Sequence, residues 1–294
     1  MTSTISDPVA HAAELLRAGK LVAIPTETVY GLAANALDEC AVQRIFEAKG
    51  RPFSSPLIVH VSDLAMAREL ALEWSPMADA LARRFWPGPL TIIVPKSERV
   101  PGIVTSGLSS VALRMPAHPL ALAVIAAANV PLAAPSANRF TQLSPTTAQH
   151  VRDGLGDGAD FVLDGGPCGV GIESTVLSLA GPVPRILRPG MVSRTQIEDV
   201  IGPVEVGAGE ESPGQHPKHY SPRTRVVVGD SPVEGRGVRL DSGNMPRDAA
   251  GYAERLYGKL HELDQRGYDW IAIELPPDRP EWAGVRDRII RAAN

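Results

Sequence analysis

The sequence has little cysteine and no long apolar run. Its two cysteines, Cys40 and Cys168, give no disulfide framework and cannot form a zinc site by themselves. No stretch reaches the roughly 18 to 20 apolar residues that a membrane-spanning helix needs. The segment from Met1 to Leu16 carries no basic residue ahead of an apolar core, so we expect no signal peptide. These absences together indicate a cytoplasmic protein without a membrane contact.

Motifs of several common enzyme classes are also missing. There is no GxxxxGK[ST] sequence, which excludes nucleotide binding by a P-loop. No HExxH or CxxC sequence appears, and no Ser-His-Asp order marks a hydrolase triad. The formal net charge of −4 argues against a protein that holds nucleic acid by general electrostatic attraction, although it leaves room for a local basic patch.

Short apolar runs separated by helical stretches fill the N-terminal part of the chain. We expect strands at residues 21–24, 57–61, 90–94, 111–113, 130–134 and 161–163. Helices are expected from Pro8 to just before Gly19, from near Asp38 to Lys49, and from Pro119 to Ala128. Strands that alternate with helices predict an α/β domain.

The composition changes after Ile201. Residues 203–224 are rich in Gly, Pro, Glu and Ser and show no periodicity, so we interpret them as a linker. Beyond them we expect strands at 225–228 and 270–275, a helix through Ala253 to Leu263, and a closing helix at 285–293. We therefore divide the chain into a first domain (1–202), a linker (203–224) and a small α/β domain (225–294). The last has about 70 residues and is expected to lean on the first domain.

Polar side chains cluster between Pro25 and Val61. Hydroxyls and a carboxylate at Thr26, Glu27 and Thr28 follow the first expected strand, where they suit a polar ligand or simply satisfy a turn. Lys49 and Arg51 flank Gly50 at the end of a helix, where they either neutralise the helix dipole or clamp a phosphate. The residues alone leave both alternatives open.

Similar groups recur further along the chain. Hydroxyls and cations accompany apolar runs in residues 109–116, 134–138 and 171–176, and Arg188 follows another run. His60 lies inside an expected strand, where a histidine is more often packed than reactive. Four such polar strand ends in one α/β domain predict a single cleft supplied by several elements.

These segments together resemble one family. PTETVYGLAANAL, IFEAKGRP, PLIVHV, ALRMP, APSAN, SPT, IESTV and ILRPG follow in the order of the YrdC-like threonylcarbamoyl-AMP synthase family. SPGQHPKHYSP in the linker resembles the connector of the family's two-domain form, and DRIIRAAN resembles its last helix. The resemblance covers nearly the whole chain. It implies a YrdC-like twisted mixed sheet with flanking helices and a small C-terminal α/β domain.

The resemblance also implies a reaction. L-Threonine and bicarbonate form an N-carboxy intermediate, whose carboxylate attacks the α-phosphate of ATP to give threonylcarbamoyl-AMP and pyrophosphate. The product would feed a downstream tRNA threonylcarbamoyl-transferase machinery that modifies adenosine beside the anticodon, with a weak direct tRNA contact left open. Mg²⁺ would accompany ATP, without protein side chains assigned to it. Such a displacement at phosphorus needs positioning and charge neutralisation more than a protein nucleophile.

Residue roles follow from the matching positions. The resemblance implies threonine contacts from Thr28, His60, Arg114, Ser136 and Ser174, with Arg114 on the substrate carboxylate. It implies ATP contacts from Arg51, Ser55, Ser110, Asn138, Ser144, Arg188 and Tyr220. Lys49 is expected to join the phosphate-binding group, so Lys49, Arg51 and Arg114 are the expected catalytic cations. Tyr220 lies in the linker, which would then act as a lid.

Two alternatives and three departures from the family accompany this interpretation. An RNA-binding or ribosome-assembly factor on the same fold is the runner-up, and the acidic net charge argues against it. A carbamoyltransferase of the hydrogenase-maturation type is excluded, because it needs cysteine-rich zinc motifs. The chain has Ser55 where the family often has Asn, an unusual Arg139–Leu143 loop, and a shortened second domain. Glu27 is a candidate base for the threonine amine only by its proximity in sequence.

Overall fold

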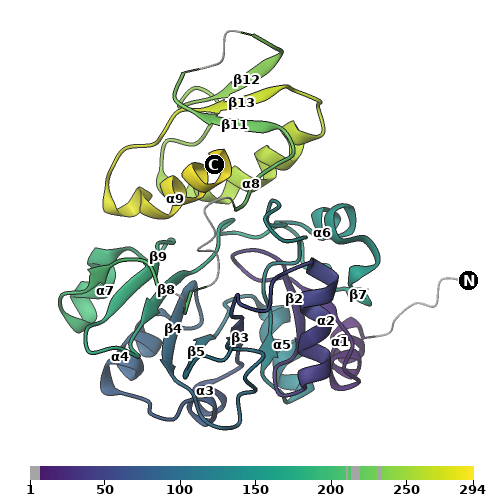
Figure 1. Cartoon of the computed structure of the whole chain (residues 1–294), viewed down its shortest axis with the longest axis vertical. Coiled ribbons are helices and arrows are strands. Elements are labelled where there is room, and N and C mark those ends of the chain that lie inside the picture. The colour runs from purple at the N-terminus through teal and green to yellow at the C-terminus, as the bar shows by residue number, and fades with distance from the viewer. Residues whose placement is uncertain (1–6, 210, 213–218, 231–233) are drawn as a thin grey trace, which may run out of the picture.

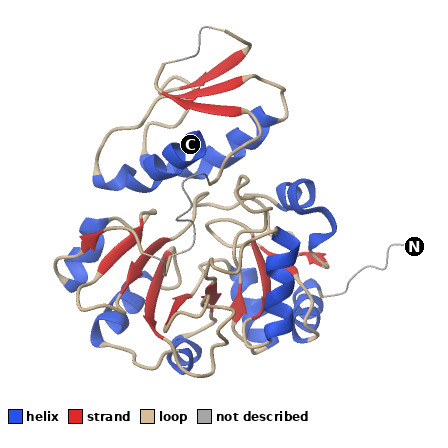
Figure 2. Cartoon of the chain, viewed as in Figure 1, coloured by secondary structure: helices blue, strands red, loops and turns tan. Residues whose placement is uncertain are grey.

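The structure, a computed structural model, describes residues 7–209, 211–212, 219–230 and 234–294. It consists of a larger unit and a smaller C-terminal unit, with helices α8 and α9 between the small sheet and the larger unit (Figure 1). Figure 2 shows that helices flank both sheets. The predicted architecture, a twisted mixed sheet with flanking helices and a small C-terminal α/β unit, is confirmed.

Ten described strands form the large sheet, in the order β10-β9-β8-β4-β5-β3-β6-β2-β1-β7. Their bounds are β1 Val22–Ile24, β2 Gly31–Asn35, β3 Ile58–His60, β4 Leu90–Pro95, β5 Ser110–Arg114, β6 Leu132–Ala133, β7 Phe161–Val162, β8 Thr175–Ser178, β9 Arg185–Arg188 and β10 Glu205–Val206. The pairs β1/β7, β3/β5, β4/β8 and β9/β10 are parallel, and the other neighbours are antiparallel. The sheet is therefore mixed throughout.

The helices of the larger unit begin and end at local signals. They are α1 Pro8–Arg17, α2 Glu39–Lys49, α3 Leu64–Leu70, α4 Pro76–Phe85, α5 Pro119–Ala128, α6 Ala148–Leu155 and α7 Arg194–Ile201, with a short 3-10 turn at Gly156–Gly158. The Asp38 carboxylate accepts hydrogen bonds from the amides of Cys40 and Ala41, which fixes the start of α2. Gly50 ends the same helix in the left-handed conformation (φ 60°). The three predicted helices of this unit are confirmed.

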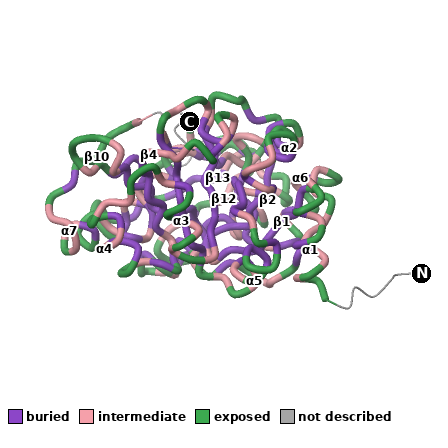
Figure 3. Tube along the Cα trace, turned by 90° about the horizontal axis from the view of Figure 1, so that it is seen from below, coloured by how far each residue is buried: buried purple, intermediate pink, exposed green. Residues whose placement is uncertain are grey.

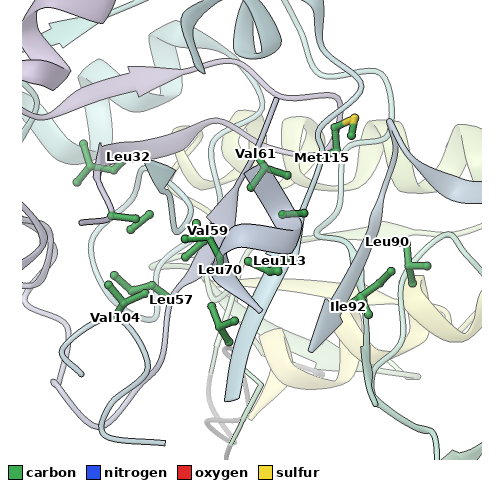
Figure 4. Packing of buried hydrophobic residues seen from close by; sticks show 14 of the residues in the cluster. Leu32, Leu57, Val59, Val61, Leu70, Leu90, Ile92, Val104, Leu113 and Met115 are labelled. Atoms are coloured by element: carbon green, nitrogen blue, oxygen red, sulfur yellow. The ribbon is translucent and has the colours of Figure 1, made fainter. Parts of the chain in front are cut away.

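The sheet presents two different faces, because side chains alternate along each strand. In β5, Val111 and Leu113 join the main hydrophobic core, where Figure 4 shows Leu113 beside Val59. Ser110, Ala112 and Arg114 point to the opposite face. That second face carries only a small apolar cluster from the central strands, consisting of Ile58, Ile93, Ala112, Val176 and Leu187. These five side chains are buried, and Figure 3 shows buried residues concentrated in the interior of the molecule. Helices α1 and α5 pack on this face at its β1, β2 and β6 end, so other segments cover its central part.

Strands β2, β8, β9 and β10 of the large sheet were not among the expected strands, and two of them, β2 and β10, gave no strand signal in the sequence. The GLAAN segment of β2 has no alternation and small side chains, yet it pairs with β1 on one side and β6 on the other. Residues 205–206, inside the predicted linker, form β10 because β9 offers an unpaired edge. In both cases the neighbouring strand, rather than local propensity, makes the segment extended.

The smaller unit has a three-stranded parallel sheet in the order β11-β13-β12. Its elements are β11 Arg225–Val228, β12 Gly237–Leu240, α8 Ala249–Asp264, β13 Trp270–Ile273, a 3-10 turn at Pro280–Trp282 and α9 Ala283–Ala293. All except β12 and the 3-10 turn were predicted. Its core includes Val29, Leu143 and Ile172 of the larger unit, so the expectation that it leans on the first domain is confirmed.

Within the described ranges, no helix is long and apolar enough to cross a membrane.

Candidate active site

A buried pocket lies on the second face of the large sheet. Its cavity volume is about 50 Å³. It is lined by Thr26, Thr28, Val29, Gly31, Arg51, Pro56, Leu57, Ile58, His60, Arg114, Ala134, Pro135, Ser136, Glu173, Ser174, Arg188, His219 and Tyr220. All five residues expected to bind threonine are among them, together with Arg51, Arg188 and Tyr220 of the expected ATP set.

Arg114 and His60 lie side by side at the ends of the parallel strands β5 and β3. The Arg114 guanidinium is buried, with Nη2 2.7 Å from Glu27 Oε1, and Nε donates to the Gly88 carbonyl. Burial, reinforced by the charge of Arg114, lowers the pKa of His60 to about 3, so its imidazole is neutral at physiological pH. This side of the pocket presents one fixed cation beside neutral polar groups.

Ser174 and Arg188 meet because β8 and β9 are antiparallel, so the start of β8 lies beside the end of β9. Arg188 donates to the Ser174 carbonyl through Nε and to Ser174 Oγ through Nη2, both at 3.1 Å. Ser174 Oγ also lies 2.7 Å from Thr91 Oγ1. Ser174 is the residue directly before β8, whereas the polar groups of the site were expected where strands end. The pocket thus lies across one face of the sheet as well as at strand ends.

Lys49 and Arg51 form the other cationic side. The turn at Gly50 directs the Arg51 guanidinium to Ser55 Oγ and, at 3.0 Å, to the Pro56 carbonyl. Lys49 Nζ donates to the carbonyls of Ser136 and Asn138, so it holds the segment that carries Ser136. Lys49 and Ser55 are not among the lining residues, and in this structure each acts on a neighbour that is closer to the pocket.

Lys49, Arg51 and Arg188 are buried cations, and neighbouring cations among them affect one another electrostatically. Burial, followed by the charge of Arg51, lowers the pKa of Lys49 well below its usual value. Burial, together with the charge of the neighbouring Arg188, lowers the pKa of Arg51 to about 10. Buried cations that weaken one another are stabilised by an anionic ligand. The electrostatics therefore suit a phosphate-bearing molecule.

The remaining expected ATP contacts lie just outside the pocket lining. Asn138 Nδ2 donates to the carbonyls of Arg139 and Gln142 and closes that turn. Ser144 Oγ donates to Glu173 Oε1. Ser110 Oγ lies 2.8 Å from Glu211 Oε1, while Ser178 Oγ lies 2.8 Å from Glu211 Oε2.

The linker covers the second sheet face. Glu211 reaches Ser110 and Ser178, and Tyr220 is 1% exposed. The Tyr220 ring lies 5.1 Å from the guanidinium of Arg288 and 4.1 Å from the His219 ring. Residues 213–218 of the SPGQHPKHYSP motif lie outside the described residues, as does residue 210.

The unusual loop Arg139–Leu143 contacts the linker directly. Ser221 N donates to the Thr141 carbonyl at 3.0 Å, and Gln142 forms a bridge with Ser221. The Phe140 ring packs edge-on against the His219 ring, with centroids 5.7 Å apart, and lies under the Arg51 guanidinium. This departure from the family pattern therefore has a structural role, because it docks the linker beside Arg51.

Sequence reasoning missed Glu173, His219 and Arg288 as parts of this region. Arg288 stands on α9 in the same stripe as the buried Val285, Ile289 and Ala292. A charged residue on the apolar face of a helix must find a buried partner, so the position of Arg288 could have indicated a buried ion pair. Glu173 carried no such signal, because its partners are distant in sequence.

In the part of the chain that the structure describes, no three His, Cys, Asp or Glu side chains form a group that could hold a metal ion. The side chains that line the pocket are mostly cationic or neutral. They do not fit a metal held by the protein itself.

Comparisons with family models, related sequences and solved structures all point to the same family. A family model described as telomere recombination matches residues 14–190, and one described as threonylcarbamoyl-AMP synthase, C-terminal domain, matches residues 192–294. The chain is 41% identical to a threonylcarbamoyl-AMP synthase of Pyrococcus abyssi, over 96% of this chain and 93% of that protein. It is 40% identical to that of Bacillus subtilis, over 99% and 94%. The solved structure of P. abyssi Sua5 complexed with L-threonine is similar with a TM-score of 0.92 and 38% identity, over 97% of this chain and 94% of that one.

Proposed function

The chain belongs to the threonylcarbamoyl-AMP synthase family, and we propose that it makes L-threonylcarbamoyl-AMP from L-threonine, bicarbonate and ATP, with release of pyrophosphate. One observation carries the proposal. A single buried pocket combines Arg114 and small hydroxyls on one side with Arg51 and Arg188 on the other. Such a pocket suits an amino acid beside a polyphosphate.

The threonine side uses Arg114 for the substrate carboxylate. A guanidinium offers two parallel donors that match a carboxylate, and Glu27 holds this one in place at 2.7 Å. The hydroxyls of Thr28, Ser136 and Ser174 supply partners for the polar groups of the substrate. Neutral His60 can accept or donate one hydrogen bond without adding charge beside Arg114.

The reaction has two steps. The threonine amine adds to the carbon of bicarbonate with loss of water, which gives a carbamate. A carbamate oxygen then attacks the α-phosphorus of ATP, the bond to the bridging oxygen breaks, and pyrophosphate leaves. No protein nucleophile is required, so the residues act by holding both substrates in line and by neutralising charge.

The phosphate side supplies that neutralisation. We assign the triphosphate to Arg51 and Arg188, with Lys49 adding to the local positive charge behind them. Ser55, Ser110, Asn138 and Ser144 support this side through the hydrogen bonds that position their neighbours. Mg²⁺ would arrive with ATP, bound to phosphate oxygens, where it would offset negative charge on the leaving pyrophosphate.

The linker acts as a lid in this proposal. Pockets for drug-sized ligands have volumes of roughly 300–1,000 Å³, whereas this one has about 50 Å³. Both substrates can therefore enter only if the covering groups move, and Tyr220 and Glu211 are the linker groups that close the sheet face. We accordingly retain residues 1–202 as the catalytic unit, 203–224 as the linker and 225–294 as the small unit.

The product is a mixed anhydride of a carbamic acid and AMP, which is reactive toward water and amines. We propose that it is consumed by the machinery that threonylcarbamoylates tRNA. An RNA-binding factor is the weaker candidate, because the described cations of the site are buried instead of forming an exposed platform.

Pyrophosphate release by the purified chain tests the proposal. We expect release that requires ATP, L-threonine and bicarbonate together, and a product with the mass of threonylcarbamoyl-AMP. ATP turnover that is independent of threonine would refute it. So would salt-sensitive binding of bulk tRNA without any turnover, which would favour the RNA-binding alternative.

A further inference from the structure

Arg288 of α9 is the largest fully buried side chain in the described part of the molecule. Removing a guanidinium from water is costly unless a charged partner and several acceptors compensate it. The smaller unit could have placed a leucine at this position of its apolar helix face at no such cost. The arginine is therefore expected to do something for the larger unit, toward which it points.

Its bonds reach two segments of the pocket wall. Nε donates to Glu173 Oε2 at 2.7 Å, and Nη2 donates to the Glu173 carbonyl at 3.3 Å. Nη1 donates to the Pro189 carbonyl at 3.1 Å and to Asp287 Oδ2 at 2.6 Å. Glu173 directly precedes Ser174, and Pro189 directly follows Arg188. One side chain of the C-terminal unit thus joins both segments that carry pocket residues.

The backbones at this junction leave no room for adjustment. A Cβ on Gly284 of α9 would lie 2.8 Å from Gly190 Cα. A Cβ on Gly190 would in turn lie 2.4 Å from the amide nitrogen of Thr175. Only glycine allows α9, the turn after β9 and the start of β8 to pack this closely. The geometry of the Arg288 contact is therefore set by backbone packing rather than by a flexible side chain.

Glu173 is the group that this contact controls. Glu173 is one of the residues that line the pocket, and its carboxylate interacts electrostatically with Lys49 and Arg188. Although burial alone would raise it, the charges of Arg288 and then Arg188 lower the pKa of Glu173 to about 2, so the group is ionised at neutral pH. A permanent anion beside a phosphate site is an internal competitor for the cations of that site.

We propose that Arg288 is a positioning residue that holds the Glu173 carboxylate to the C-terminal unit, so that this anion does not compete with phosphate groups for the cations of the pocket. Ser144 Oγ bonds to Oε1, while the Tyr257 hydroxyl, 3.1 Å away, and Arg288 bond to Oε2. The inference rests on the proposed function for the identity of the phosphate ligand. It gives the smaller unit a task in the reaction that sequence alone left open.

If Arg288 restrains the Glu173 charge, the effect of losing Arg288 should be reversed by also removing that charge. Arg288→Met keeps the volume and apolar stem but frees the Glu173 carboxylate, which then pairs with the pocket cations. We expect the KM for ATP to rise on the order of tenfold or more, with a smaller change in the KM for threonine. Adding Glu173→Gln removes the competing charge, so the double variant is expected to regain an ATP KM within about threefold of the original.

The decisive comparison is the double variant against Arg288→Met. Pyrophosphate release is measured while ATP and threonine are varied separately. Arg286→Met is the matched control, because Arg286 also lies on α9 but bonds to Pro276 and Asp278 within the smaller unit. A double variant no better than Arg288→Met would overturn the proposal, as would equal increases in both KM values. A purely structural role would give additive losses instead of rescue.

Two further measurements keep the test decisive. If Arg288→Met does not fold, Tyr257→Phe removes one bond to Glu173 Oε2, and its ATP KM should rise and be restored by Glu173→Gln. An unchanged ATP KM in Tyr257→Phe would then overturn the proposal. Calorimetric titration with ATP alone separates the two proposals, because it reports phosphate binding even where no threonylcarbamoyl-AMP forms. Equal ATP affinity of the original chain and Arg288→Met would refute the positioning role without touching the proposed reaction.

Discussion

Removing the Arg114 guanidinium should strongly raise the KM for threonine while sparing ATP binding. Arg114 is buried, and Nη2 lies 2.7 Å from Glu27 Oε1. Arg114→Ala deletes the group that we propose pairs with the substrate carboxylate, and it leaves the Glu27 carboxylate without its partner. Truncating one partner of a buried charge pair between a protein and its ligand costs about 2–5 kcal/mol of binding free energy. At about 1.4 kcal/mol per factor of ten, the KM for threonine should rise by roughly 1.5 to 3.5 powers of ten.

The same substitution lowers stability, so binding and folding must be separated. The Glu27 carboxylate that loses its partner stays buried, and Arg114→Ala should therefore lower the melting temperature. Glu27→Gln in the Arg114→Ala background removes that uncompensated charge and should restore part of the stability. It should not restore threonine affinity, because the substrate carboxylate still lacks a cation.

The assay is pyrophosphate release against threonine concentration at saturating ATP and bicarbonate. Calorimetric titration with ATP on the same samples is expected to give an affinity within about threefold of the original chain, a difference below 1 kcal/mol. A threonine KM within threefold of the original would remove Arg114 from the threonine side of the site. Parallel loss of ATP binding would show that the substitution had disturbed the whole pocket.

Three further predictions concern the lid, the substrate and pH. Tyr220→Ala should weaken ATP more than threonine in separate KM measurements, since Tyr220 covers the pocket, and unchanged ATP kinetics would count against the lid. Serine should be used roughly tenfold to a few hundredfold less well than threonine, because one methyl group in a fitted pocket is worth about 1–3 kcal/mol; equal kcat/KM values would contradict this. His150 and His261 stack with ring centroids 3.9 Å apart across the two units, and burial followed by the charge of His261 lowers the pKa of His150 to about 4. The His150 imidazole is therefore protonated at a higher pH in the unfolded chain than in the folded one. The free energy of unfolding should keep its full value above pH 6.5 and fall as the pH drops toward 4, while the charges of Asp153 and Asp264 offset part of this loss. Melting temperatures measured across this range should fall less for His150→Gln, and an identical slope would exclude the pair as the cause.

Local signals in the sequence were enough to predict most of the helices and strands. Helix α2 begins after Asp38, whose side chain caps its first turn, and ends at Gly50, whose left-handed backbone conformation caps its last turn. The apolar runs of the central strands are buried on both faces and were visible for that reason. By contrast, β2 and β10 are extended only because distant strands pair with them, and no feature of GLAAN or of residues 205–206 announced this.

The sequence by itself determined the family, because its cations and hydroxyls follow one another in the order of that family's motifs, and from this order it predicts a substrate with carboxylate and phosphate groups. It could not decide which of those residues face the pocket. Sheet register placed His60 beside Arg114 and Ser174 beside Arg188, while Lys49 and Ser55 hold their neighbours instead. Only the packing of the two units brought Arg288 to Glu173, 115 positions earlier in the chain. Hydrogen-bond partners separated this far are chosen by tertiary packing, which leaves no periodic trace in the sequence.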